Sequence, residues 1–300
     1  MKDLCNQCPR KCNVDRSVGT GLETGFCGAT NQLKVAKAFL HMWEEPCISG
    51  TQGSGTIFFS GCNLKCVYCQ NYQISQDNFG KVISLDRLKQ IIMELIAQGA
   101  HNINLVNPSH YTEALKQVLN DLKKSGELSV PVVYNSSGYD TVETLKTLEG
   151  IVDVYLPDLK YSSVETAFKY SKAKDYPEVS KQAVLEMYRQ VGSPELGETG
   201  IIQKGLIIRH LILPGHTKES ISILNWISEN FPKSIYVSLM SQYTPYYAVE
   251  KFPEINRPIT RKEYDRVVDH LYKLGLEEGY VQERHSSDTQ YIPDFNLEGV

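Results

Sequence analysis

Residues 56–71 read TIFFSGCNLKCVYCQN and contain the feature that decides how this chain folds. The first part, 56–60, is a short apolar run rich in β-forming residues. It leads directly into a loop that carries Cys62, Cys66 and Cys69. We therefore expect a buried strand that delivers three thiols at its carboxyl end.

Outward from this stretch, strand-like and helix-like segments alternate along the chain. The strand-like runs are 56–60, 103–106, 130–134, 152–156, 206–213 and 235–240. The helical patterns are 84–100, 111–124, 140–148, 163–191 with a break near Pro177, 217–230 and 260–274. Thr260 and Glu263 form a capping box, and Ser84 and Asp140 are expected N-caps. Six strand–helix units in a row predict a parallel α/β fold, because parallel neighbours need crossover connections. A barrel and a doubly wound open sheet both fit this pattern.

Residues 1–55 do not join the alternation. Cys5, Cys8, Cys12 and Cys27 have the spacing C-x2-C-x3-C-x14-C, which can supply four thiolates to one metal site. Zinc and an auxiliary iron–sulfur cluster both remain open there. We expect 1–55 to be a small cysteine-rich extension, 56–285 the main domain and 286–300 a loose tail. Cys47 stands alone and is expected to be a small buried hydrophobic residue.

The bulk composition excludes some classes of function. The 300 residues carry a net charge of −4, so no bulk charge favours nucleic acid or an anionic membrane as a partner. No apolar run approaches the roughly 18 residues of a membrane span, and the first ten residues do not resemble a signal peptide. We therefore expect a cytoplasmic protein. In a reducing compartment, clustered cysteines indicate metal binding rather than disulfides.

The loop cysteines follow the pattern C-x3-C-x2-C. A cubane iron–sulfur cluster has four irons and usually four cysteine ligands. Three cysteines in one loop would bind three irons and leave the fourth open, as in a reactive rather than a structural metal site. A structural zinc site is the alternative.

This pattern, with Tyr68 before the last cysteine, resembles the signature of radical S-adenosylmethionine enzymes. The stretch from Gly61 to Asn71 is similar to that of the activating enzymes for glycyl-radical proteins such as pyruvate formate-lyase. The resemblance implies a partial (β/α)6 barrel of the TIM type, a [4Fe–4S] cluster and bound S-adenosylmethionine. It also implies reductive cleavage to a 5′-deoxyadenosyl radical, with electrons from a donor such as flavodoxin or ferredoxin.

The resemblance further implies which residues bind the cofactor. Tyr68 belongs to the cysteine motif, and Asp158 and Lys160 match an Asp-Leu-Lys stretch of the activating enzymes. Arg209 corresponds to an arginine of these relatives, whereas the adjacent His210 should face the opposite way, because side chains alternate along a strand.

Two candidate positions depart from the relatives. Asn107 stands where they often carry Gly-Gly-Glu-Pro, and Asn135 where they carry an aspartate, with Ser137 close behind. Each asparagine is either a cofactor ligand or part of a turn. Gln242, after the sixth strand, is a weaker candidate.

Three functions follow from these residues. The first is a radical enzyme that installs a glycyl radical on a partner protein. The second is the same chemistry on a small molecule or a peptide. The third is an iron–sulfur or zinc protein without catalysis, which the incomplete ligand set disfavours.

Overall fold

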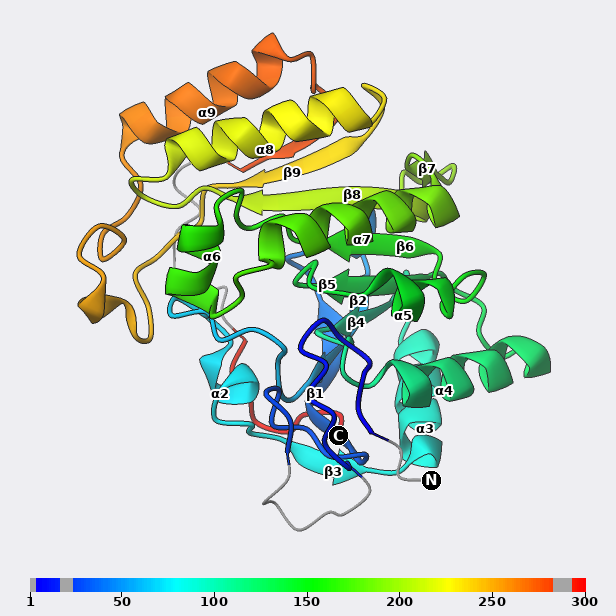
Figure 1. The fold of residues 1–300 in the computed structure, drawn as a ribbon. Helices are drawn as coiled ribbons and strands as arrows, with labels where there is room; N and C mark the ends of the chain where they lie inside the picture. Colours follow the sequence, from blue (N-terminus) through cyan, green and yellow to red (C-terminus); the bar gives the residue numbers. More distant parts are fainter. Residues whose placement is uncertain (1–3, 17–23, 283–292) are drawn as a thin grey trace.

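The computed structural model of the chain describes residues 4–16, 24–282 and 293–300. These residues form an α/β fold around one large sheet, with strand order β10-β9-β8-β6-β5-β4-β2-β1-β3 and β7 paired to β8 alone. The strands are β1 (Leu33–His41), β2 (Ser54–Phe59), β3 (Lys81–Ile83), β4 (Ile103–Val106), β5 (Val132–Ser136), β6 (Val154–Pro157), β7 (Glu195–Leu196), β8 (Ile202–Leu211), β9 (Tyr236–Met240) and β10 (Gly279–Val281). In Figure 1 the strands follow one another from β3 and β1 at the bottom to β9 near the top.

The six expected strands are β2, β4, β5, β6, β8 and β9, and each pairs with the next in parallel. The path ends at β10 on one side and at β3 on the other, and these two do not pair within the described ranges. The sheet is therefore an open, partial barrel. This confirms the parallel α/β prediction and decides against a closed ring.

The helices also follow the sequence pattern. They are α1 (Pro46–Ser49), α2 (Tyr72–Ser75), α3 (Leu85–Ala97), α4 (Thr112–Ser125), α5 (Val142–Lys146), α6 (Val164–Ser171), α7 (Tyr176–Val191), α8 (Thr217–Asn230) and α9 (Arg261–Lys273), and η1 (Val249–Lys251) is a 3-10 turn. Ser84 caps α3, and the Thr260–Glu263 capping box at α9 is confirmed. The expected cap of α5 was wrong: Thr141 caps it. Asp140 is instead buried, and its carboxylate accepts hydrogen bonds from the hydroxyls of Tyr134 and Ser136 within the core rather than from the first turn of the helix.

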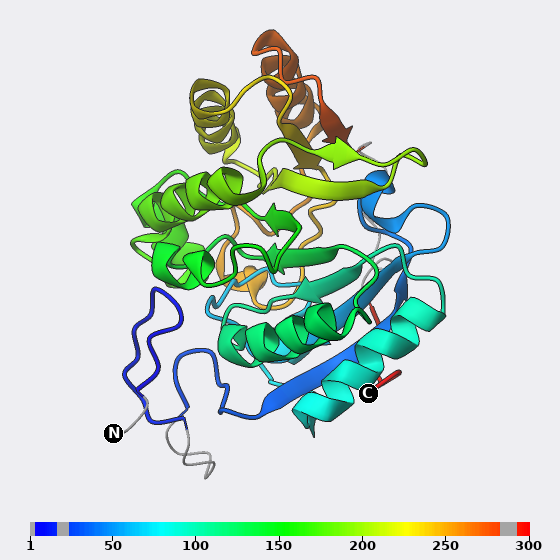
Figure 2. The same cartoon turned by 90° about the vertical axis from the view of Figure 1, so that its right-hand side faces the viewer.

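Part of the expected N-terminal extension belongs to the main sheet. Strand β1 is antiparallel to β2 and pairs with it from Val35 to His41. Residues 5–14 form a hairpin, in which the Cys5 amide donates to the Val14 carbonyl at 3.0 Å. In Figure 2 this hairpin lies at the edge of the molecule, below the green helices. Cys47 is buried among apolar side chains of β5, β6 and β8, as expected.

The C-terminal segment is not a loose tail where the structure describes it. The Ala38 amide of β1 donates to the Glu298 carbonyl at 2.8 Å. Phe295 is buried, with its ring centroid 5.4 Å from that of Phe58 in β2. Residues 293–300 therefore pack onto β1 and β2, while 286–292 of the expected tail lie outside the described residues. No helix in the described parts of the chain is long and apolar enough to cross a membrane.

Candidate active site

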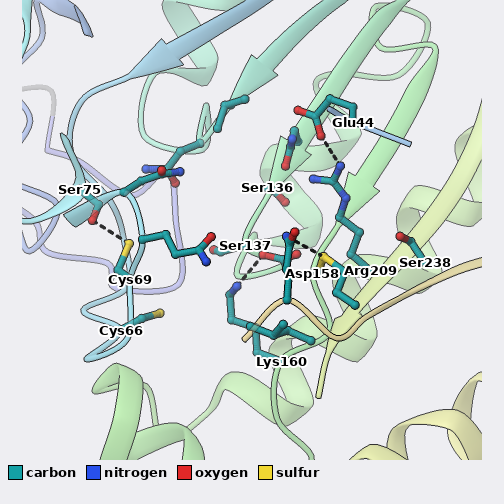
Figure 3. A pocket seen from close by; sticks show the side chains of 18 of the residues that line it. Glu44, Cys66, Cys69, Ser75, Ser136, Ser137, Asp158, Lys160, Arg209 and Ser238 are labelled. Atoms are coloured by element: carbon teal, nitrogen blue, oxygen red, sulfur yellow. Dashed lines mark hydrogen bonds and ion pairs between the residues drawn. The ribbon is translucent and has the colours of Figure 1, made fainter. Parts of the chain in front are cut away.

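A cavity of about 550 Å³ lies inside the partial barrel, and the cysteine loop lines one part of it. Cys62, Cys66 and Cys69 all belong to its lining, as do Asp158 and Lys160, which follow β6. In Figure 3 the labelled cysteines lie on one side and Arg209 on the other, with Asp158 and Lys160 between them. The cavity thus brings together side chains from several strand ends, where α/β barrels carry out their chemistry.

The cysteine loop has a tightly defined backbone. Gly61 has φ 88°, in the left-handed region, and a Cβ at this position would lie 2.7 Å from the Cys27 carbonyl oxygen. Only glycine fits both constraints without strain. The turn at Gly61 therefore directs the chain from β2 into the cysteine loop.

Each of the three sulfurs has a polar neighbour. The Leu64 amide donates to Cys62 Sγ at 3.3 Å, and the Ser171 hydroxyl donates to Cys66 Sγ at 3.0 Å. Cys69 Sγ lies 3.2 Å from Ser75 Oγ, a contact drawn in Figure 3. Hydrogen bonds to cysteine sulfur stabilise thiolate ligands and tune the reduction potential of iron–sulfur clusters.

Tyr68 begins a chain of hydroxyl groups that leads back to Cys66. Its hydroxyl lies 2.6 Å from that of Tyr161, which lies 2.6 Å from Ser171 Oγ. Because Ser171 gives its single proton to Cys66, it accepts from Tyr161, and Tyr161 in turn accepts from Tyr68. The aromatic residue of the motif is thus tied to the position of a cysteine ligand.

The three loop cysteines are available as metal ligands. All eight cysteines of the chain are free thiols. Burial, with a smaller contribution from Cys66, raises the pKa of Cys62 to about 12, so its thiolate form needs a nearby positive charge such as a metal. Among the described residues, no three His, Cys, Asp or Glu side chains gather closely enough to hold one ion. A cubane binds each thiolate to a separate iron, so three cysteines in one loop can hold three of its irons.

Asp158 and Lys160 form an ion pair in the cavity wall, with Lys160 Nζ 2.5 Å from Asp158 Oδ2. Burial alone would lower the pKa of Lys160, but the Asp158 carboxylate outweighs it and raises that pKa. Lys160 is therefore a fixed cation that faces the cysteine loop. Such a group can bind the carboxylate of an amino acid.

Arg209 also lines the cavity, but its charge is already neutralised. Its guanidinium pairs with both oxygens of Glu45, at 2.7 and 2.5 Å, and with Glu44. Asn104 donates to the other oxygen of Glu44 at 2.8 Å. His210 points the opposite way and is hydrogen-bonded to the Leu159 carbonyl and to Ser220, as the alternation along β8 predicted.

Asn107, Asn135, Ser137 and Gln242 also line the cavity. Asn107 has φ 61°, and its side-chain amide donates to the Gly61 carbonyl, so it supports the cysteine loop. Ser137 Oγ donates to the Asn63 side chain at 3.3 Å. The residues predicted to bind the cluster and the cofactor therefore line one cavity, although several already have partners. The N-terminal cysteines Cys5, Cys8, Cys12 and Cys27 are not part of its lining.

Glu44 and Glu45 are charged cavity residues that the sequence reasoning missed. They precede Pro46 on the connection between β1 and β2, within a region that we expected to lie apart from the barrel. The adjacent acids in the stretch HMWEEPC were the available signal. Their partner could not be deduced, because Arg209 lies far away in the sequence.

Comparison with known proteins agrees with this geometry. The sequence matches the profile of the radical SAM superfamily over residues 56–227. The chain belongs to the radical SAM superfamily.

Several known proteins and solved structures are similar to this chain. An uncharacterized protein of Methanocaldococcus jannaschii, MJ0674, is 33% identical over 282 residues, which cover 91% of this chain and 75% of that protein. Streptococcus suis SuiB bound to S-adenosylmethionine has a TM-score of 0.49 at 14% identity, with 74% of this chain and 48% of that chain covered. The hydrogenase maturase HydG of Carboxydothermus hydrogenoformans has a TM-score of 0.48 at 15% identity, with 79% and 56% covered. The chain thus spans about half the length of these two solved proteins.

Radical SAM membership implies a [4Fe–4S] cluster and S-adenosylmethionine. The cavity contains residues suited to both, since three free thiols lie in one loop and a paired lysine faces them.

Proposed function

We propose that this protein cleaves S-adenosylmethionine reductively and uses the resulting 5′-deoxyadenosyl radical to remove a hydrogen atom from a second substrate. The observation that carries the proposal is the shared cavity. The three cysteines and the Asp158–Lys160 pair line one space of about 550 Å³, within the size range of small-molecule sites.

Different residues of the cavity would bind the cluster and the cofactor. Cys62, Cys66 and Cys69 would hold the cluster, and Lys160 would bind the carboxylate of the cofactor. Asn107 and Asn135 would supply polar contacts in place of the glutamate and aspartate of the activating enzymes. When bound, the cluster and cofactor together supply one-electron cleavage of a carbon–sulfur bond. The surrounding barrel would keep water and other hydrogen donors away from the radical.

Two classes of substrate follow from this proposal. Installation of a glycyl radical on a partner protein is supported by the sequence likeness at Gly61–Asn71 and at Asp158–Lys160. The alternative is a small molecule or peptide. The charged group of Arg209, Glu44 and Glu45 supports it, because such a group within the cavity can orient a polar substrate.

A one-electron donor and a second metal site complete the proposal. A flavodoxin or ferredoxin in a reducing, cytoplasmic setting would supply the electron. Cys5, Cys8, Cys12 and Cys27 would hold a second metal group, either zinc or iron–sulfur.

The test is an anaerobic assay for 5′-deoxyadenosine with reconstituted protein, dithionite and S-adenosylmethionine. We expect product from the wild type and from Cys47→Ala, but none from Cys66→Ala. Cys47 is the matched control because it is a buried cysteine outside the cysteine clusters. Equal product from Cys66→Ala would refute the proposal.

Glycyl-radical installation is tested separately. A glycyl-radical protein encoded beside this one is mixed with the reduced enzyme and the cofactor, and electron paramagnetic resonance is recorded. A doublet that depends on Cys66 supports this target. Cofactor cleavage without any protein radical favours the small-molecule or peptide substrate.

A further inference from the structure

The cysteine loop runs against the carboxyl end of α6, close to the molecular surface. The Lys65 amide donates to the Ser171 carbonyl at 3.4 Å, so the loop and the helix end are joined at this point. The Ser171 hydroxyl donates to Cys66 Sγ at 3.0 Å, and the next residue, Lys172, is exposed. The sulfur of Cys66 is thus linked to an exposed residue through a single serine.

Arg10 of the N-terminal hairpin reaches the same place. Its Nε donates to the Asn63 carbonyl of the cysteine loop at 2.9 Å. Its two other nitrogens donate to the carbonyls of Ser171 and Lys172, at 3.3 and 2.5 Å. These three acceptors are neutral, so they hold the guanidinium in place without cancelling its charge. Arg10 therefore keeps a positive charge beside the cysteine loop.

Three lysines add to this charge. Lys65 Nζ lies 5.6 Å from the centroid of the Phe26 ring, and the Arg10 guanidinium lies 3.7 Å from the same centroid. Lys172 and Lys174 are exposed just beyond the end of α6. The chain as a whole carries a net charge of −4, so this group of cations differs in sign from the protein that bears it. We call it the basic patch, and it consists of Arg10, Lys65, Lys172 and Lys174.

Two neighbouring acids reduce the charge of the basic patch only in part. Glu254 pairs with Lys169 at 2.5 Å, and that lysine is not part of the patch. Asp175 is exposed and accepts a hydrogen bond from the Tyr139 hydroxyl at 2.5 Å. With Asp175 counted, these described residues still have a surplus of positive charge. A local surplus of one sign raises the association rate of a partner of the opposite sign.

An exposed apolar stripe borders the basic patch. Val164 and Phe168 lie one helical turn apart on α6 and are 54% and 45% exposed. The Nζ atoms of Lys172 and Lys174 lie 5.5 and 4.7 Å from the centroid of the Phe168 ring. This surface combines a small apolar contact with charge at its edge, a combination that suits a transient protein partner.

We infer that the basic patch is the docking surface for an acidic one-electron carrier protein of the flavodoxin or ferredoxin class. The electron then enters through Ser171 and Cys66, because the cations that would hold the carrier surround this link. The inference rests on the proposed function, which supplies the acceptor at Cys66. The carrier is oxidised by one electron, the acceptor is reduced by one, and no bond forms or breaks.

The first test measures binding. Wild type and the charge-reversal variant Lys172→Glu/Lys174→Glu are titrated with oxidised flavodoxin at low salt. Because both lysines are exposed, the fold should be retained, while the dissociation constant should rise about tenfold. The difference should shrink as salt is added, since salt screens charge attraction. Equal affinities at low salt would overturn the inference.

The matched control is Lys262→Glu/Arg266→Glu. These two residues are exposed on α9, which lies at the top of Figures 1 and 2, whereas α6 lies lower in Figure 1. The control has the same net charge as the test variant, so it should bind flavodoxin like the wild type. An equal loss of affinity in the control would show that overall charge, and not the basic patch, attracts the carrier.

The second test locates the contact on the wild type. A carbodiimide joins a lysine ammonium to a nearby carboxylate as an amide, with loss of water. Mass spectrometry should find flavodoxin carboxylates joined to Lys65, Lys172 or Lys174. Cross-links confined to lysines elsewhere, such as Lys262, would refute the docking surface.

The third test follows the electron, without S-adenosylmethionine. Rapid mixing with reduced flavodoxin should reduce the iron–sulfur group of Lys172→Glu/Lys174→Glu about tenfold more slowly than that of the wild type. The small reductant dithionite should reduce both proteins at nearly the same rate. Equal rates with flavodoxin would refute the inference. If flavodoxin reduces the wild type through the basic patch but S-adenosylmethionine is not cleaved, the proposed function fails while the docking surface stands.

Discussion

Replacement of Arg209 by methionine should destabilise the protein far more than an ordinary loss of an ion pair. The side chains of Arg209, Glu44 and Glu45 are 13%, 9% and 5% exposed. Without the guanidinium, two carboxylates remain in the barrel interior with no cation. Breaking a buried pair in this way costs about 3 to 5 kcal/mol.

The expected shift in melting temperature follows from the size of the protein. An unfolding entropy of about 2.1 cal/mol/K per residue gives about 0.6 kcal/mol/K for a chain of this length, so Tm should fall by about 5 to 8 °C. Circular dichroism melting of anaerobically reconstituted protein measures it. The triple change Arg209→Met with Glu44→Gln and Glu45→Gln should recover most of the loss, because it leaves no unpaired charge.

The effect of Arg209→Met should depend on pH in a defined direction. Burial opposes the ionisation of Glu45, but Arg209 outweighs it and lowers the pKa of that carboxyl. In the wild type, Glu45 therefore stabilises the fold above its unfolded pKa of about 4.3. This stabilising contribution is lost as the pH falls through the lower folded pKa. In the variant, burial is opposed only by the smaller effects of the Ser238 and backbone hydrogen bonds, so the folded pKa of Glu45 should rise. The destabilisation should therefore grow as the pH rises above about 4.3.

Arg189→Met is the matched control. Arg189 also pairs with two glutamates, Glu149 and Glu186, but its side chain is 50% exposed. Solvent screens such a pair, so Tm should hardly change. Equal shifts for the two arginine variants, or no recovery in the triple variant, would refute the reasoning.

Other expectations concern single residues. Ser171→Ala removes the hydroxyl that donates to Cys66 Sγ, a hydrogen bond that favours the more negative, reduced state of the cluster. The reduction potential of the cluster should therefore fall by about 40 to 60 mV in a potentiometric titration. An unchanged potential would contradict this. Cys47→Ala should leave iron and sulfide content unchanged and cost about 1 kcal/mol in urea unfolding, so a loss of iron would make that residue a ligand. The Phe295 ring is buried against Phe58, so Phe295→Ala should lower the free energy of unfolding by about 3 to 5 kcal/mol and make the C-terminal segment sensitive to proteases. A stability equal to wild type would show that the segment is not docked.

Local sequence was sufficient for much of the fold and for the reactive centre. The alternation of apolar runs and amphipathic helices depends on neighbouring residues, so the six parallel strands and most caps were predictable. Cys62, Cys66 and Cys69 lie within one loop, and their spacing alone indicated a cluster with an open iron. Asp158 and Lys160, two residues apart, were likewise recognisable as a pair.

Contacts between distant parts of the chain were decided only by the tertiary structure. Strand β1 joins the sheet by antiparallel pairing, which leaves no trace in a β/α alternation. Arg209 was expected to meet the cofactor, but its neutralisation by Glu44 and Glu45 depends on a connection that enters the barrel from more than 160 positions away. The hydrogen bond from Cys62 to Cys27 is of the same kind, because the backbone groups that form it carry no side-chain signature. Sequence therefore determined which chemical groups are present, and folding determined which of them face one another, because the energy of a contact depends on distance in space rather than along the chain.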